Sequence, residues 1–288
     1  MTCSYHWITP SIQLISKKDL QFPSASAIEF YNNRLYVFGD DAPYLLILSP
    51  GYQVMDSVYF LPGVEGRIPK DTKHDIESAM IGMQDNQPVL YGIGSMSTKK
   101  RWGVIAYNLS DKSFKDSLFF EPGKIFPGID EVNIEGSCTV SNIAILANRA
   151  NESNPNNHLL FIDKQSATVK RMLLPARKLM PGLSGLYYVK EKDLLLFTAS
   201  EEETGSSTSD GAIGDSYLGW IENFSKKMGD TEYKPDQFIR LADTEKAFNK
   251  QKIESVCVES VDGNNLIIHL TADNDNGRSS LFKLKLKL

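Results

Sequence analysis

The sequence predicts an all-β fold, a five-bladed β-propeller, and three observations lead to that prediction. Short runs rich in β-branched, aromatic and leucine residues follow one another along the chain, separated by turn residues such as Asn32 and Asn33. A short motif with an apolar residue before a Glu recurs about every 56 residues, which is the size of a four-stranded propeller blade. The 288 residues of the chain are enough for five such units.

The recurring motif marks the first, innermost strand of each blade. Its five copies lie at residues 27–30, 75–78, 133–136, 182–185 and 252–255. Four copies carry a glutamate at the third position, namely Glu29, Glu77, Glu135 and Glu254, and the remaining copy carries Ser184. We therefore expect the blades to begin near residues 27, 75, 133, 182 and 252.

Three further strands follow the motif in each unit. The second strand ends on a polar residue, which is Asp40, Ser95, Asn148, Ser200 or Asp273. The third strands are predicted at residues 45–48, 103–107, 159–163, 217–221 and 281–284, and the fourth at 53–60, 115–120, 169–174 and 237–241. The fifth unit ends after its third strand. Residues 11–20 are predicted to complete that blade, which would close the ring and remove two exposed sheet edges.

Helical signals are almost absent. Only residues 244–251 resemble a helical turn, and no strand–glycine loop–helix unit of a nucleotide-binding domain occurs. We therefore expect a single propeller domain over residues 1–288 rather than a two-domain α/β enzyme.

Composition excludes several classes of protein. With 41% hydrophobic and 23% charged residues the chain is neither disordered nor fibrous, and its net charge of −5 offers no basic surface for nucleic acid. The longest apolar runs are far too short to span a membrane, and no secretion signal precedes the first motif. Three scattered cysteines fit a reducing compartment. We expect a cytoplasmic monomer whose partner is a small ligand or a protein.

The long loops favour one face of the disc. They lie at residues 61–73, 96–101, 121–131, 149–157, 199–216 and 242–251, and the propeller topology places them on the same side. Binding residues concentrate on loops that a rigid scaffold positions. Because the motif glutamates begin the innermost strands at this same rim, we expect Glu29, Glu77, Glu135 and Glu254 to converge at the mouth of the central channel.

Converging carboxylates need compensation, since two like charges a few ångströms apart repel by roughly 4 kcal/mol at an effective dielectric of about 20. A calcium ion is one remedy, and the oxygens of the four glutamates and of Asn148 are candidate ligands. Candidate ligand-binding residues around the mouth are Asp40, Arg67, Lys73, Arg149, Ser184, Glu201 and Asp273. The segment 199–216, which contains Glu201, is either a lid or an inert insertion.

A structural alternative stays open for the glutamates. A feature repeated in every blade can serve the fold, for example by accepting backbone N–H groups where the inner strands separate. Direct acid–base catalysis is a further alternative. Cys138 and Cys257 occupy equivalent positions three residues after Glu135 and Glu254, which favours buried packing thiols rather than nucleophiles.

Several segments resemble a known family. These are 26–29 with 38–41, 66–70 with 75–77, 133–136 and 182–185. Together they are similar to an uncharacterised bacterial propeller family, found chiefly in Bacteroidetes, which is distantly similar to the phytase-like esterase domain and the gluconolactonase–paraoxonase propellers. The lactonase relatives bind calcium through Glu, Asn and Asp in the channel, so the resemblance implies roles for Glu29 and Asn148.

Three functions follow as hypotheses. The leading one is a propeller that binds a small polar or anionic ligand at an acidic channel mouth, as a cation-dependent ester or phosphoester hydrolase if it is an enzyme. Its catalytic residues are not assigned by the sequence. The second is a non-catalytic scaffold for a protein partner. The third is a glycosidase with paired channel carboxylates.

Overall fold

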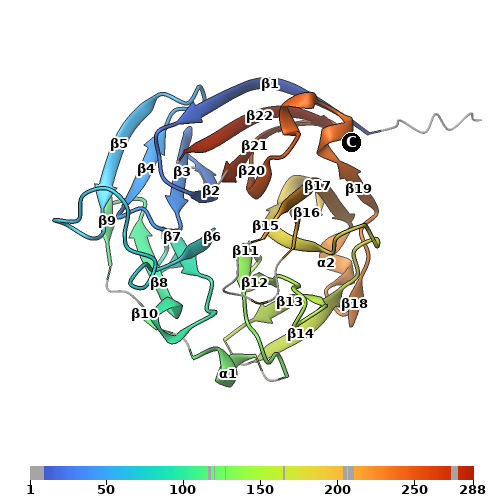
Figure 1. The fold of residues 1–288 in the computed structure, drawn as a ribbon, viewed down its shortest axis with the longest axis horizontal. Coiled ribbons are helices and arrows are strands. Elements are labelled where there is room, and N and C mark those ends of the chain that lie inside the picture. The colour runs from blue at the N-terminus through green and yellow to red at the C-terminus, as the bar shows by residue number, and fades with distance from the viewer. Residues whose placement is uncertain are drawn as a thin grey trace, which may run out of the picture.

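The computed structural model describes residues 10–115, 118–119, 121–126, 128–164, 166–203, 206, 211–273 and 278–288. It confirms the predicted fold class, because five antiparallel sheets stand around a central channel as the blades of a propeller (Figure 1). No helix in these ranges is long and apolar enough to cross a membrane.

Each blade begins with its innermost strand at the channel, and in blades 1 to 4 the next strands follow outward in chain order. Blade 1 contains β2 (Ala25–Tyr31), β3 (Arg34–Gly39), β4 (Tyr44–Leu48) and β5 (Val54–Tyr59). Blade 2 contains β6 (Ile76–Gln84), β7 (Gln87–Gly94), β8 (Gly103–Asn108), β10 (Leu118–Phe119) and the short β9 (Ser113–Phe114) beside β8. Blade 3 contains β11 (Ile134–Val140), β12 (Ile143–Asn148), β13 (Asn157–Ile162), β14 (Ala167–Met172) and β18 (Glu232–Tyr233).

The last two blades complete the ring. Blade 4 contains β15 (Pro181–Val189), β16 (Leu194–Glu202), β17 (Ile213–Glu222) and β19 (Gln237–Arg240). Blade 5 contains β20 (Lys252–Asp262), β21 (Asn265–Asp273), β22 (Ser279–Lys287) and β1 (Ser11–Leu20). The antiparallel pairing of β1 with β22 confirms that the N-terminal strand closes the ring.

The sequence does not predict the short strands β9 and β18 or most of the helical turns. The strand β18 lies parallel to β14, and its two residues come from the link between β17 and β19. Short helices occur at α1 (Pro122–Ile125) and α2 (Phe224–Lys227), with 3₁₀ turns at Lys99–Arg101, Lys190–Lys192, Leu241–Asp243 and Lys246–Phe248. Only the last of these lies within the segment predicted to be helical.

Tight turns hold the inner hairpins. Asn32 and Asn33 join β2 to β3 with φ of 49° and 59°, and Asp85 and Asn86 join β6 to β7 with φ of 50° and 60°. Positive φ at both central residues defines the type I′ turn, whose twist matches that of the strands and which Asn and Asp tolerate.

The hydrophobic core is divided into five clusters, one at each interface between neighbouring blades. Between blades 4 and 5, for example, Trp220 and Leu218 pack with Val256 and Phe282. Equivalent clusters join the other four pairs. Apolar burial therefore stabilises the contacts between blades and leaves the centre of the disc to polar side chains.

A β-bulge in every innermost strand sets what reaches the channel. The register with the second strand skips one residue in each blade, namely Ser26, Glu77, Glu135, Ser184 and Glu254. These five are the structurally equivalent positions. Glu29 lies three residues beyond its own bulge, so the expectation that it aligns with Glu77 is wrong, and it matches Met80, Cys138, Tyr187 and Cys257 instead.

Small residues follow the bulge because neighbouring inner strands approach closely there. The position is occupied by Ala27, Ser78, Gly136, Gly185 and Ser255. A Cβ atom on Gly136 would lie 2.9 Å from the carbonyl carbon of Gly185 and from the amide nitrogen of Leu186. Both contacts are with backbone, which cannot rotate away, so the third blade requires glycine at this point.

Replacement of this glycine tests the close approach. We expect Gly136→Ala to lower the free energy of unfolding by about 1–3 kcal/mol, because the added methyl overpacks against the backbone of blade 4. The matched control is Gly229→Ala, since a Cβ there meets no atom within 4 Å. Urea denaturation of both variants measures the difference, and equal midpoints would contradict this packing.

Candidate functional site

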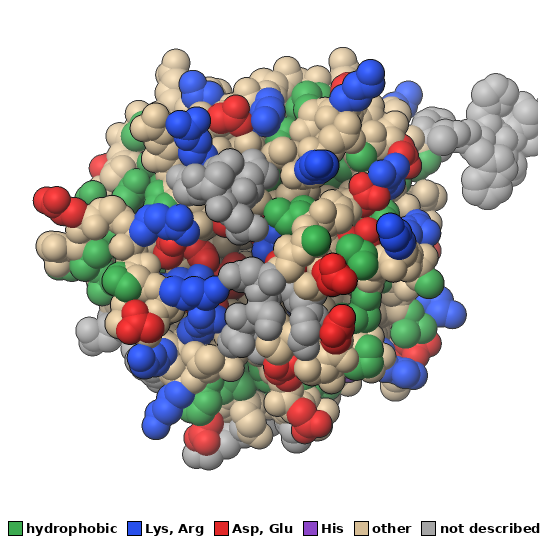
Figure 2. Space-filling model, viewed as in Figure 1, with side chains coloured by type: hydrophobic (Ala, Val, Ile, Leu, Met, Phe, Trp, Pro, Cys, Tyr) green, Lys and Arg blue, Asp and Glu red, His purple; other side chains and the backbone are tan. Residues whose placement is uncertain are grey.

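The candidate site is the mouth of the central channel on the face that carries the long loops. Figure 2 looks onto this part of the molecule and shows acidic side chains at the floor of the central hollow, with Lys and Arg side chains around them. The ends of several inner strands contribute to this floor, because the bulge lies close to the start of each one.

The bulge residues divide into two kinds. In blades 1 and 4 they are serines whose hydroxyl groups donate hydrogen bonds to the next inner strand, Ser26 to the carbonyl of Ile76 and Ser184 to that of Ile253. In the other blades they are Glu77, Glu135 and Glu254, which are too long for that contact and extend toward the mouth. The structure thus brings together three of the four predicted glutamates.

One chain of ion pairs joins blades 1 and 2. Lys73, in the link before β6, contacts Asp40, which follows β3, and its Nζ lies 2.6 Å from Oδ1 of Asp75. Arg101 places Nη1 2.7 Å from Oδ2 of the same aspartate. Burial alone would lower the pKa of Lys73, but the carboxylates of Asp75 and Asp40 outweigh it and raise that pKa above its usual value.

A second chain joins blades 3, 4 and 5. Arg149, whose side chain is only 4% exposed, places Nη1 3.5 Å from Oε2 of Glu135 and Nη2 3.1 Å from Oε2 of Glu202. Lys252 places Nζ 3.2 Å from the same oxygen of Glu202 and 3.1 Å from Oε1 of Glu254. The five groups form an alternating acid–base row that spans the mouth.

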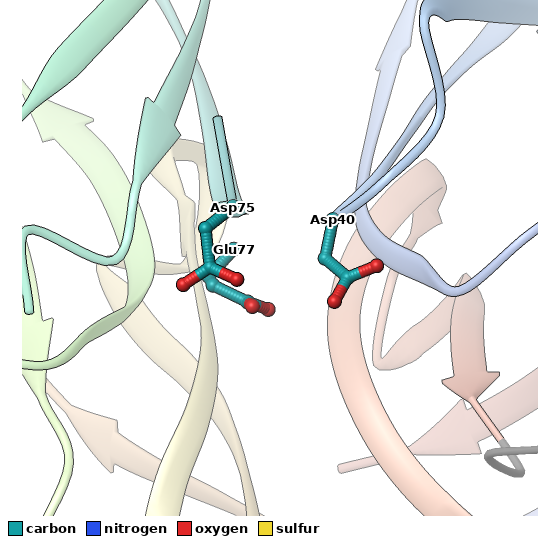
Figure 3. Close-up of side chains that lie close together, drawn as sticks. All are labelled: Asp40, Asp75 and Glu77. Carbon is teal, nitrogen blue, oxygen red and sulfur yellow. The ribbon is translucent and has the colours of Figure 1, made fainter. Parts of the chain in front are cut away.

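Glu77 lies between the two chains and has no ion-pair partner among the residues that the structure describes. Two acids lie close to it, since one oxygen each of Asp40, Asp75 and Glu77 lie within 4.8 Å of one another. Figure 3 shows Asp75 and Glu77 side by side, with Asp40 facing them from blade 1. Burial and the charges of Asp75, Glu135 and Asp40 raise the pKa of Glu77 well above its ordinary value.

We call the two chains together with Glu77 the channel cluster. Its members are Asp40, Lys73, Asp75, Glu77, Arg101, Glu135, Arg149, Glu202, Lys252 and Glu254. Six carboxylates stand against four cations, which leaves an excess of two negative charges when all are ionised. Bound protons or a bound cation would remove this excess. Burial raises the pKa of Glu254 to about 8, which agrees with partial protonation.

The residue two places before the bulge determines whether the negative charge of the bulge glutamate is stabilised by a residue of the same blade. In blade 3 it is Asn133, whose Nδ2 donates to Oε1 of Glu135 at 2.7 Å, and in blade 5 it is Lys252. In blade 2 it is Asp75, an acid beside an acid. In blade 4 it is Gly182, where a Cβ would lie 2.5 Å from Cγ of Arg149, so glycine leaves room for that arginine to cross the mouth.

Several residues predicted for the site have other contacts. Asn148 is fully buried, and its Oδ1 accepts the backbone N–H of Asn133 at 2.7 Å. Ser184 is also fully buried and bonded to the next blade. Arg67 pairs with Asp41 at the rim, where its side chain is 53% exposed. Asp273 ends β21 near the positive charge of Arg67.

The segment 199–216 contributes Glu202 rather than Glu201 to the mouth. A register shift between Ser200 and Glu202 turns the intervening side chain away, and Glu201 accepts the hydroxyl of Tyr217 at 2.7 Å instead. The strands β16 and β17 extend well into the segment predicted as a lid or insertion, and its centre lies outside the described residues. Sequence reasoning missed Glu202, Asp75 and Lys252, although the last two begin motif copies.

Glu29 lies deeper in the channel than the cluster. Its electrostatic neighbours are Cys138, Tyr187 and Cys257, the equivalent residues of blades 3, 4 and 5. Both cysteines are buried free thiols, as predicted. Burial raises the pKa of Glu29 to about 8. Burial therefore favours the protonated form of this carboxyl group.

Stability should depend on pH through Glu29. Because its folded pKa of about 8 exceeds the ordinary 4.5, its contribution is complete below pH 4.5 and is lost as the pH rises through 8. We expect Glu29→Gln to be as stable as wild type at pH 5 and more stable by on the order of 2–4 kcal/mol at pH 9. Urea denaturation at both pH values measures this. The exposed Glu222→Gln is the control, and parallel pH dependences of wild type and Glu29→Gln would refute the assignment.

Comparisons with known proteins place the chain within one family. The profile of a family described as Family of unknown function (DUF6929) matches residues 21–286. No curated protein matches the chain.

Similar solved structures include a member of the DUF4221 family from Bacteroides vulgatus, 12% identical, covering 96% of this chain and 99% of that one, with a TM-score of 0.43. Virginiamycin B lyase from Staphylococcus aureus is 9% identical, covering 97% and 100%, with a TM-score of 0.41. A tail fibre of a Staphylococcus aureus phage is 10% identical, covering 96% of this chain, with a TM-score of 0.48. The chain spans 52% of that tail-fibre chain.

Proposed function

We propose that this chain, which belongs to the DUF6929 family of unknown function, binds a small polar ligand at the channel mouth together with a divalent cation. The observation that carries the proposal is Glu77. It lies beside Asp40 and Asp75, without an ion-pair partner in the described part of the chain, inside a cluster with two more carboxylates than cations.

The residues present fit a hard cation. Calcium takes carboxylate oxygens at about 2.3–2.6 Å, so oxygens up to about 5 Å apart can share one ion. One oxygen each from Asp40, Asp75 and Glu77 meets this limit, at 4.8 Å or less from one another. These three residues would hold the ion, which would neutralise the excess charge and leave positions for a ligand.

Lys73 is the built-in competitor for that cation. Its ammonium contacts both Asp40 and Asp75, so it supplies part of the charge that a metal would bring. The ligand itself is expected to be anionic or polar, because the half-exposed Arg67 lies at the rim and would pair with it. A bound cation at this position could polarise an ester or phosphoester oxygen, and hydrolysis of such bonds is the reaction class we propose.

The glycosidase alternative receives less support. A glycosidase stacks sugar rings on exposed aromatic residues, but Trp220 is buried in the core between blades 4 and 5, and Trp102 packs between blades 2 and 3. Trp7 lies outside the described residues.

We also propose the cytoplasm as the compartment, because the buried thiols of Cys138 and Cys257 are unpaired. Cell fractionation tests this, and a secreted pool would contradict it.

Calcium titration tests the site directly. We expect wild type to bind one calcium ion with a Kd on the order of 10⁻⁴ M and Glu77→Gln to bind at least tenfold more weakly. Lys73→Met should bind more tightly than wild type, because the competing ammonium is gone. Binding should also release protons, since the cation favours the ionised form of Glu77. Isothermal titration calorimetry in two buffers of different ionisation enthalpy measures all three effects.

The control for this titration is Glu222→Gln, which should match wild type. Absence of binding in every variant, or equal affinity of wild type and Glu77→Gln, would rule out the metal site.

The same samples, incubated with p-nitrophenyl acetate and p-nitrophenyl phosphate with and without calcium, separate binding from catalysis. Turnover that requires both calcium and Glu77 would support the hydrolase proposal, and its absence would leave ligand binding alone.

A further inference from the structure

We propose that a second site, between blades 2 and 3, binds an amphipathic anion with a linear hydrocarbon body, such as a medium- or long-chain fatty acid. The structure holds a cavity of about 790 Å³ there, which is lined mainly by apolar side chains and extends to Tyr188 and Lys190 of blade 4. That is the volume of roughly 25 water molecules and lies within the size range of sites for small organic ligands.

The cavity opens on the face opposite the channel cluster. Its rim is formed by turns that follow a blade's first or third strand, including Ser141 and Asn142 after β11 and Lys164 after β13. The channel cluster instead lies where the first strands begin. The two sites are therefore separate, and this proposal does not depend on the metal.

Gly82 explains why space remains at this interface. It lies five residues beyond the bulge of β6, where Tyr31, Val140 and Val189 occupy the equivalent positions of blades 1, 3 and 4. A Cβ atom on Gly82 would lie 3.2 Å from Cε2 of Tyr91, so the ring of Tyr91 packs over this glycine, and both residues line the cavity.

The lining is adaptable and partly exposed. Met80, Met83 and Met96 contribute to it, and flexible thioether side chains conform to apolar ligands of varied shape. Met83 is 69% exposed at the edge of the cavity, the highest value among the large apolar side chains of the described residues. Exposure of such a side chain beside an apolar cavity favours a ligand that covers it.

The charge at the rim selects the sign of the ligand. Lys164 and Lys190 are the only charged residues that line the cavity, and both side chains are exposed. Neither has an ion-pair partner in the described part of the chain. Long lysine side chains can lie along apolar surface while their ammonium groups meet an anion at the edge. An apolar body with a terminal carboxylate matches both features.

Chain length gives a quantitative test with sodium octanoate, decanoate and dodecanoate below their micelle concentrations. Each added methylene should tighten binding about fourfold, the ratio that corresponds to 0.8 kcal/mol for one buried methylene. Dodecyltrimethylammonium, which has the same chain length and the opposite charge, should bind at least tenfold more weakly than dodecanoate. Calorimetry or displacement of a fluorescent fatty acid measures these affinities.

Two variants locate the ligand. The double variant Lys164→Glu with Lys190→Glu should weaken dodecanoate binding at least tenfold, while Lys285→Glu with Lys287→Glu, two exposed lysines of blade 5, should leave it unchanged. Ala144→Phe, which places a ring in the cavity, should abolish binding, with circular dichroism to verify folding. Affinity that ignores chain length, equal binding of the cationic amphiphile, or insensitivity to the rim charge reversal would each overturn the proposal.

Discussion

The close approach of five inner strands around one axis is the constraint on which this molecule depends. Near the axis the strands have room only for small residues after the bulge, such as Gly136 and Gly185, whose Cα atoms lie against neighbouring backbone. The bulge shifts the pairing of each inner hairpin by one residue. The side chain of the skipped residue then lies at the mouth or contacts the next inner strand. Packing geometry, rather than affinity among the side chains, therefore brings the acids together.

Electrostatics then decides how those acids are tolerated. Arg149 and Lys252 compensate the carboxylates of blades 3, 4 and 5, and Lys73 and Arg101 compensate those of blades 1 and 2. Glu77 is left between them, because the residue two places before it is Asp75. The excess of carboxylates favours the binding of protons or of a cation. Because the bulge glutamate without an ion pair among the described residues lies in blade 2, this blade differs from the other four. The apolar cavity between blades 2 and 3 is a second feature of the same part of the ring.

The architecture could be predicted from sequence because it rests on repetition. Strand periodicity, turn residues and the order of the segments are local signals, and together they gave the five blades and the closing role of the N-terminal strand. The bulge was not predictable, since a skipped residue changes the register without changing the pattern. Sequence alone therefore aligns Glu29, which lies three residues beyond its bulge, with Glu77, and it favours Glu201 over Glu202. The cavity is lined by residues of different blades, such as Gly82, Ala144 and Tyr188, and this tertiary relation has no sequence signature.

The central claim is that the channel cluster carries two uncompensated carboxylates that take up protons when no cation is bound. Carbon-13 NMR of glutamate side-chain carboxyl groups, titrated from pH 4 to pH 9 in the absence of divalent ions, tests it most directly, with Glu77→Gln to assign the resonance. We predict that Glu77 titrates well above the 4.5 of an ordinary glutamate. Titration of Glu77 at or below that value would contradict it.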